Sequence, residues 1–188
     1  MAQHDRSVIQ LLIDDHREVE QIFAQLESIS ASSHDERRRL TDQAIIELVR
    51  HSVAEEEYLY PAARQYIPNG EEIVESELSD HRRAERVMKK LEHTDPGEPR
   101  FGDLLDRLLR DVRKHVHDEE NELFPRLTRH TDEKALVELG RRVAEAKASA
   151  PTRPHPSAPT ERPGLLKKLA PGVGLVDQVR DVISGRGT

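Results

Sequence analysis

The sequence contains no cysteine and no tryptophan, and aromatic residues make up only 3% of its 188 residues. Without cysteine, the chain cannot form disulfides, thiolate metal sites, iron–sulfur clusters or cysteine nucleophiles. The scarcity of aromatic residues argues against β-sandwiches and barrels, which favour aromatic and β-branched side chains. No apolar run approaches the roughly 20 residues of a membrane span, and the N-terminus lacks the hydrophobic region of a signal peptide. We therefore expect a cytoplasmic protein without a transmembrane segment.

Charge and proline are unevenly distributed along the chain. The 29 basic and 36 acidic residues give a net charge of −7, so we do not expect a nucleic acid as a partner. Five of the eleven prolines lie in residues 149–163, which predicts an extended linker. Residues 164–188 contain two short apolar pieces with helical spacing, which predicts an amphipathic tail.

The sequence therefore divides into a folded domain, 1–148, the linker and the tail. Residues 149–188 hold six basic and three acidic residues, so the tail is basic and the folded domain is acidic. Opposite charges favour docking of the tail onto its own bundle or self-association with a second copy. A tail without a role and a tail that binds an anionic membrane are the alternatives.

The folded domain has the pattern of helices throughout. It shows no alternation typical of strands, and residues that break helices occur only in clusters. The expected helical stretches are 5–28, 36–67, 71–93, 101–128 and 132–148. We expect Pro61 and Pro125 to kink or end their helices. Four helices of similar length with short connections predict an all-α, up-down-up-down four-helix bundle with an extra C-terminal helix.

Two halves of this domain repeat one another. The tripeptide Asp-His-Arg occurs at 15–17 and again at 80–82. A phrase that begins His-xxx-Glu-Glu and ends Leu-aromatic-Pro occurs at 51–61 and again at 115–125. The histidines of the two copies are 65 and 64 residues apart, so the domain is a duplicated helical hairpin.

Four histidines of the repeat belong to the apolar faces of their helices. Apolar residues stand three and seven positions before each histidine, and a glutamate stands four positions after it. Because they lie at similar distances from the turns, the four imidazoles are expected in one layer of the core. Histidines and glutamates in a dry core are costly without a cation, and this donor set suits iron, zinc, manganese or nickel. A buried network of His–Glu hydrogen bonds remains the alternative.

The order of these residues resembles a known family, the hemerythrin-like proteins with an HHE cation-binding domain, and in particular its actinobacterial members. The matching positions are His16, His51-xxx-Glu55, His81 and His115-xxx-Glu119. The resemblance covers residues 1 to about 130. It implies a hemerythrin-like bundle that holds two non-haem iron ions joined by an oxo or hydroxo bridge. The four histidines would be terminal ligands and the two glutamates would bridge the irons; manganese and zinc are not excluded.

The resemblance is incomplete at one ligand. Oxygen-carrying hemerythrins have a fifth histidine in a His-xxx-His pair on the third helix, whereas here His81 is followed by Glu85. The actinobacterial members imply a tyrosine ligand instead. Tyr58 lies two turns after His51 on the same helical face as Glu55, so Tyr58 is the expected extra ligand. The alternative is a tyrosine that donates a hydrogen bond to the ligands without binding the metal. Glu85 and Glu122 are the other candidates.

A phenolate ligand favours ferric over ferrous iron, which bears on function. Reversible carriage of dioxygen needs a stable di-ferrous state, whereas a ferric-favouring centre suits reaction with hydrogen peroxide or nitric oxide. We therefore expect a protein that handles peroxide or related reactive species, with catalase-like turnover possible. The alternative is a non-enzymatic protein that binds or senses O₂, NO or iron at the same site. A purely structural bundle is the third possibility.

Overall fold

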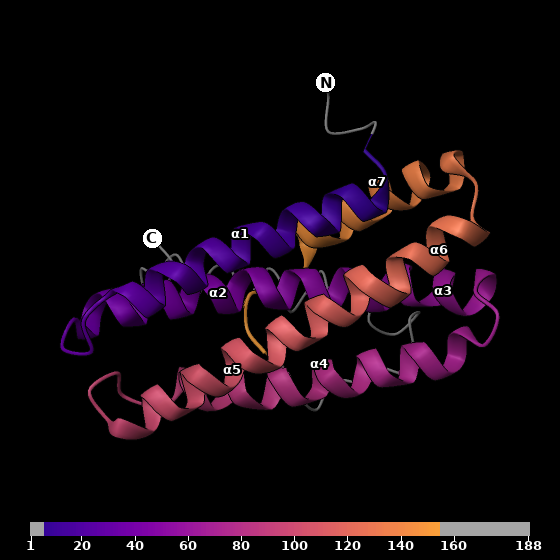
Figure 1. Cartoon of the computed structure of the whole chain (residues 1–188). Coiled ribbons are helices and arrows are strands. Elements are labelled where there is room, and N and C mark those ends of the chain that lie inside the picture. The colour runs from indigo at the N-terminus through magenta and orange to yellow at the C-terminus, as the bar shows by residue number, and fades with distance from the viewer. Residues whose placement is uncertain (1–5, 155–188) are drawn as a thin grey trace.

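The computed structural model describes residues 6–154, and regular structure within that range is entirely helical. Figure 1 shows the helices. Their bounds are α1 (Val8–Ser28), α2 (His34–Ala54), α3 (Tyr60–Tyr66), α4 (Gly70–Glu92), α5 (Pro99–Asp118), α6 (Phe124–His130) and α7 (Glu133–Ser149). The all-α class is confirmed. The predicted tail, 164–188, and most of the predicted linker lie outside the described residues.

Two helical hairpins form the bundle. Helix α1 packs against α2, and α4 packs against α5, so each half of the repeat forms one hairpin. Helices α3 and α6 continue the lines of α2 and α5 at one end of the bundle (Figure 1). Helix α7 lies against α1 and α2, outside the four-helix core. The predicted bundle with an additional C-terminal helix is therefore confirmed.

Helix α7 is fixed closely to the start of α1. Its first turn is capped by Asp132, whose side chain accepts a hydrogen bond from the backbone N–H of Ala135 at 2.8 Å. Further along α7, a Cβ at Gly140 would lie 2.5 Å from the carbonyl oxygen of Arg6. Only glycine allows this approach of the two backbones. This contact helps to place the C-terminal end of α7 beside the middle of α1.

A π-helical turn interrupts the second helix of each hairpin at the same place in the repeat. The turns cover Glu55–Leu59, between α2 and α3, and Glu119–Leu123, between α5 and α6. A proline follows two residues after each turn, and proline lacks a backbone N–H and clashes with the carbonyl four residues earlier. The wider π-helical turn accommodates the missing N–H and the clash. In each turn, the residue before the proline donates its backbone N–H to the carbonyl oxygen five residues earlier. The predicted interruptions are therefore present, but the helices continue beyond them.

The apolar core consists of two clusters with a polar layer between them. The first cluster lies toward the α1–α2 and α4–α5 connections and includes Ile22, Phe23, Ile45, Leu91, Phe101 and Leu108. The second lies toward α3, α6 and α7 and includes Leu12, Leu59, Ala63, Leu123, Leu127 and Val143. The buried histidines and glutamates of the repeat separate these two clusters along the bundle.

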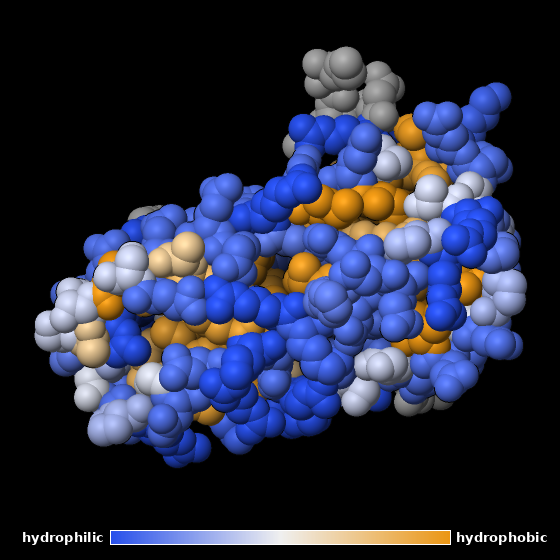
Figure 2. All heavy atoms as spheres, in the orientation of Figure 1, coloured by the Kyte–Doolittle hydropathy of each residue, from blue (hydrophilic) through white to orange (hydrophobic). Residues whose placement is uncertain are grey.

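The face of the bundle seen in Figure 2 is predominantly hydrophilic, with apolar side chains visible in narrow strips. Among the described residues, Tyr66 is the one large hydrophobic side chain that is clearly exposed, at 40%. No helix in residues 6–154 is both long enough and apolar enough to cross a membrane.

Candidate metal centre

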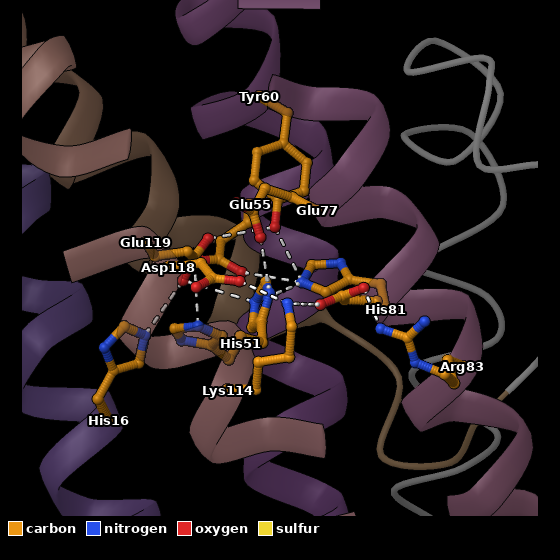
Figure 3. A network of polar contacts seen from close by, with 12 residues as sticks. His16, His51, Glu55, Tyr60, Glu77, His81, Arg83, Lys114, Asp118 and Glu119 are labelled. Atoms are coloured by element: carbon orange, nitrogen blue, oxygen red, sulfur yellow. Dashed lines mark hydrogen bonds and ion pairs between the residues drawn. The ribbon is translucent and has the colours of Figure 1, made fainter. Parts of the chain in front are cut away.

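The four histidines of the repeat meet in the middle of the bundle, and three of them, His16, His51 and His81, are labelled in Figure 3. His16 comes from α1, His51 from α2, His81 from α4 and His115 from α5, and all four are buried. The rings of the first two lie 4.9 Å apart between centroids, and those of the last two lie 4.7 Å apart. Each hairpin therefore contributes one pair of imidazoles to the same layer.

Two glutamates lie between these pairs. Glu55 and Glu119 are the first residues of the two π-helical turns, and both are 0% exposed. Glu55 Oε1 lies 3.0 Å from Nε2 of His51, and its Oε2 lies 3.4 Å from Nε2 of His81. Glu119 Oε2 lies 3.4 Å and 3.5 Å from Nε2 of the α1 and α5 histidines. Each carboxylate therefore faces one histidine from each hairpin.

Several inward atoms of this cluster lack a well-formed hydrogen bond. Both carboxylate oxygens of Glu55, Oε2 of Glu119 and Nε2 of His16 are buried without a hydrogen bond of acceptable geometry. Burying carboxylate oxygens in this way costs several kcal/mol or more unless a cation compensates them. Unpartnered nitrogen and oxygen atoms that converge on one small space fit metal ligation.

The ligand atoms form three overlapping groups, each within 4.8 Å, and one of them joins Glu77 to His115 and Glu119. The other two contain most of the ligand atoms. One group, which we name the first position, consists of His16, His51, Glu55 and Glu119. The other, the second position, consists of Glu55, His81 and His115. Because the groups share a glutamate, the residues suit two neighbouring cations bridged by carboxylate.

The outer nitrogen of each imidazole faces a further carboxylate. The pairs are His16 with Glu120 at 2.8 Å, His51 with Asp15 at 3.3 Å, His81 with Glu56 at 2.9 Å, and His115 with Glu77 at 2.8 Å. In each pair the histidine atom is Nδ1. A carboxylate on Nδ1 fixes the ring and leaves Nε2 free to bind a metal, and it also increases the basicity of that nitrogen.

Nearby carboxylates raise the pKa of two of the histidines. Burial favours the neutral ring of His51, but the charges of Glu55 and Asp15 outweigh it and raise the pKa of His51 to about 10. The pKa of His81 is likewise raised well above its usual value, because Glu55 and Glu56 outweigh the effect of burial. A metal ion that binds here must displace these protons.

Tyr60 brings a further oxygen to the cluster. This side chain is fully buried, and its hydroxyl lies 2.9 Å from Nε2 of His81 and donates to Oε1 of Glu119 at 3.2 Å. Burial, together with the negative charges of Glu55 and Glu119, raises the pKa of the Tyr60 phenol well above its usual value. The hydroxyl is therefore protonated near neutral pH unless a cation takes the place of its proton.

The sequence reasoning missed Tyr60 and selected Tyr58 in its place. Tyr58 is partly buried and packs against the second apolar cluster. On a regular α-helix Tyr58 would share the face of His51, whereas the π-helical turn widens the spacing and brings Tyr60, five positions after Glu55, over the cluster. The signal was the aromatic-Pro pair that both halves share, since proline favours this interruption.

The two alternative candidates differ in their exposure. Glu85 is partly buried on α4. The side chain of Glu122 is exposed and lies 3.8 Å from Arg126 on the surface. Neither belongs to the groups of ligand atoms in the described residues.

Together, the fold and this cluster define the chain as a helical bundle that can hold cations in its core. A family model, the hemerythrin HHE cation binding domain, matches residues 7–127. The chain belongs to this family.

A solved structure and two curated proteins are similar to the chain. The structure of a hemerythrin HHE cation binding domain-containing protein from Mycobacterium kansasii has a TM-score of 0.67 and 22% identity, over 76% of this chain and 86% of that one. An uncharacterized hemerythrin-like protein of Schizosaccharomyces pombe is 29% identical over 178 residues, which are 92% of this chain and 84% of that protein. A DNA nickase of Nostoc is 28% identical over 121 residues, 64% of this chain but only 33% of the nickase.

Proposed function

We propose that the cluster holds two non-haem iron ions joined by an oxo or hydroxo bridge. His16 and His51 would bind the iron of the first position, and the histidines of α4 and α5 would bind the iron of the second. Glu55 and Glu119 would bridge the two. The observation that carries this proposal is the set of buried carboxylate oxygens that lack hydrogen bonds between two pairs of imidazoles. Manganese and zinc would accept the same donors.

If both glutamates bridge, Tyr60 would give the second position one donor more than the first. Tyr60 lies against His81, and its ring centroid is 5.3 Å from that imidazole. At the equivalent place in the other half, Phe124 stacks on His16, with centroids 5.7 Å apart and planes 8° from parallel. Phenylalanine offers no ligand atom. The first position is thus the place that the protein leaves for an external ligand.

The space beside the cluster limits the size of that ligand. A cavity of about 30 Å³ adjoins the four histidines on the side of the first apolar cluster. Val19, Leu48 and Met88 contribute apolar side chains to its wall, and Asp15 and Asp80 contribute carboxylates. A water molecule needs about 10–15 Å³ of such volume. Hydrogen peroxide, O₂ and NO are therefore ligands of suitable size.

We favour reaction with hydrogen peroxide or related reactive species, with catalase-like turnover. Bound iron supplies electron exchange and Lewis acidity. The chain keeps bulk water from the site through the two apolar clusters, orients the imidazoles through their outer carboxylates, and offers the oxygen of Tyr60 as a hard anionic donor. A donor of this kind favours the ferric state, which suits peroxide better than reversible binding of O₂. The small cavity also supports the second candidate, a protein that binds O₂ or NO without turnover.

Metal analysis and a peroxide assay test the proposal. The full-length chain is loaded with ferrous iron, freed of excess metal, and analysed for iron and for its rate of peroxide decay. We expect two irons per chain and a decay rate above that of the same protein stripped by chelator. Two irons without peroxide decay would favour the binding function. A chain that retains no iron would contradict both.

A further inference from the structure

The two halves of the repeat differ in how they hold the outer nitrogen of one histidine. In the first half, Asp15 faces Nδ1 of His51, and Lys147 of α7 pairs with the same carboxylate at 2.5 Å. The repeat places Asp80 at the equivalent position of the second half. Asp80 instead pairs with Arg83 and with Lys114, the latter at 3.4 Å. The histidine of α5 therefore needs another partner.

That partner is Glu77, one turn before His81 on α4. Its Oε2 lies 2.8 Å from Nδ1 of His115, although off the direction of a well-formed hydrogen bond. Glu77 is only 4% exposed, and the repeat places the fully buried Leu12 at the equivalent position of the first half. Figure 3 shows Glu77 beneath Tyr60 and beside Glu55. A carboxylate thus stands where the other hairpin has an aliphatic side chain.

A buried carboxylate at this place has no structural justification by itself. An apolar residue of similar volume is often neutral or stabilising in place of a buried charge, and Leu12 shows that the fold accepts one at the equivalent position. No lysine or arginine among residues 6–154 pairs with Glu77, whereas Asp15 shares its charge with Lys147. The negative charge of Glu77 is therefore less neutralised than that of Asp15, and its electric field acts more strongly on His115 and on the space between the histidines.

We propose that Glu77 is a positioning residue that makes the second metal position bind its ion more tightly than the first. It acts through His115, by holding Nδ1 at 2.8 Å so that the ring turns its inner nitrogen toward the second position. Glu77 and Tyr60 then reinforce each other, because both depart from the repeat and both face the second position. Leu12 and Phe124 are their apolar counterparts in the other half. The inference rests on the two-metal centre proposed above.

Stepwise removal of metal from the full-length chain tests this proposal. The protein is loaded with cobalt(II) alone, and the retained metal is measured at increasing concentrations of a chelator. We expect the wild type to release its two ions in two steps. Glu77→Gln keeps an acceptor but removes the charge, and it should shift the later step to about tenfold less chelator. Glu77→Leu removes both the acceptor and the charge, so the later step should occur at up to about 100-fold less chelator. Losses of about 10- to 100-fold in metal affinity are usual when a partner of a metal-binding histidine is replaced.

Matched variants separate positioning from other roles. Asp42→Asn changes a buried carboxylate of α2 that pairs with Arg38 at 3.5 Å and does not line the cavity, and it should leave both steps in place. Asp15→Asn should shift the earlier step instead, because Asp15 holds His51 of the first position. Far-UV circular dichroism of the metal-free proteins checks folding. If Glu77→Gln does not fold, Glu77→Leu carries the test, since the first half already has leucine there.

Two results would overturn the proposal. If both Glu77 variants release cobalt at the same chelator concentrations as the wild type, the carboxylate does not affect metal binding. A variant that holds one ion even at saturating cobalt would show that Glu77 is itself a ligand, because its oxygen also lies within 4.8 Å of the ligand atoms of His115 and Glu119. A wild-type chain that never holds two ions would instead contradict the two-metal centre, and this is seen before any variant is compared.

Discussion

Replacing Tyr60 with phenylalanine isolates the oxygen that the structure places at the cluster. The change keeps the ring, and Phe124 at the equivalent place shows that a phenylalanine ring fits beside a histidine in this fold. The hydroxyl makes two contacts with buried groups, at 2.9 Å and 3.2 Å. At roughly 0.5–1.5 kcal/mol for each hydrogen bond, the metal-free variant should lose about 1–3 kcal/mol of its free energy of unfolding. For a domain of this size, that lowers the Tm by roughly 2–12 °C.

Two measurements check this prediction. Thermal unfolding of the chelator-treated proteins, followed by circular dichroism, gives the change in Tm. The visible spectrum of the iron-loaded proteins reports the phenolate, because a tyrosine bound to ferric iron gives a charge-transfer band that Tyr60→Phe should abolish. Tyr58→Phe is the control and should keep the band. A Tyr60→Phe variant with an unchanged Tm and an unchanged spectrum would refute the role of Tyr60, and loss of the band only in Tyr58→Phe would restore the register expected from the sequence.

Three further predictions concern the metal, pH and the tail. Glu55→Ala should retain at least one iron fewer than the wild type in metal analysis. It should also lose much of the stabilisation by bound metal, which is about 2.7 kcal/mol per site when the free metal is at a hundredfold excess over Kd. An iron content and a Tm equal to those of the wild type would contradict the bridging role. Because the pKa of His51 is raised from 6.5 to about 10, its contribution to stability is present below pH 6.5 and is lost toward pH 10. Urea unfolding should therefore show the metal-free protein weakening over this range while the metal-loaded protein weakens less, and parallel curves would argue against it. Deletion of residues 155–188 should leave iron content and peroxide decay unchanged and alter only self-association, measured by light scattering; loss of iron would place part of the site in the tail.

Much of the architecture follows from local pattern. The apolar positions three and seven residues before each histidine define one helical face, and the repeat at a distance of 64–65 residues sets two hairpins of equal length. Helical periodicity is a local property, so His16 and His51 could be placed at one level of the core before the fold was known. Composition predicted the end of the folded domain less well, because it placed the start of an extended linker at residue 149, where α7 ends. Ala150 and Thr152, at the start of the predicted linker, are buried, and Arg153 lies 3.5 Å from Glu92.

Helical spacing alone is enough to predict that four histidines and two glutamates share the core of a bundle, because spacing along a helix fixes which face a side chain occupies. Tertiary structure decided which further groups reach them. The π-helical turn ahead of Pro61 placed Tyr60 rather than Tyr58 at the cluster, and a turn of this width leaves no mark in helical spacing. The packing of α4 against α5 places Nδ1 of His115 beside the carboxylate of Glu77 rather than beside that of Asp80. Such a pairing depends on how two helices rotate and approach, which periodicity within either helix does not contain.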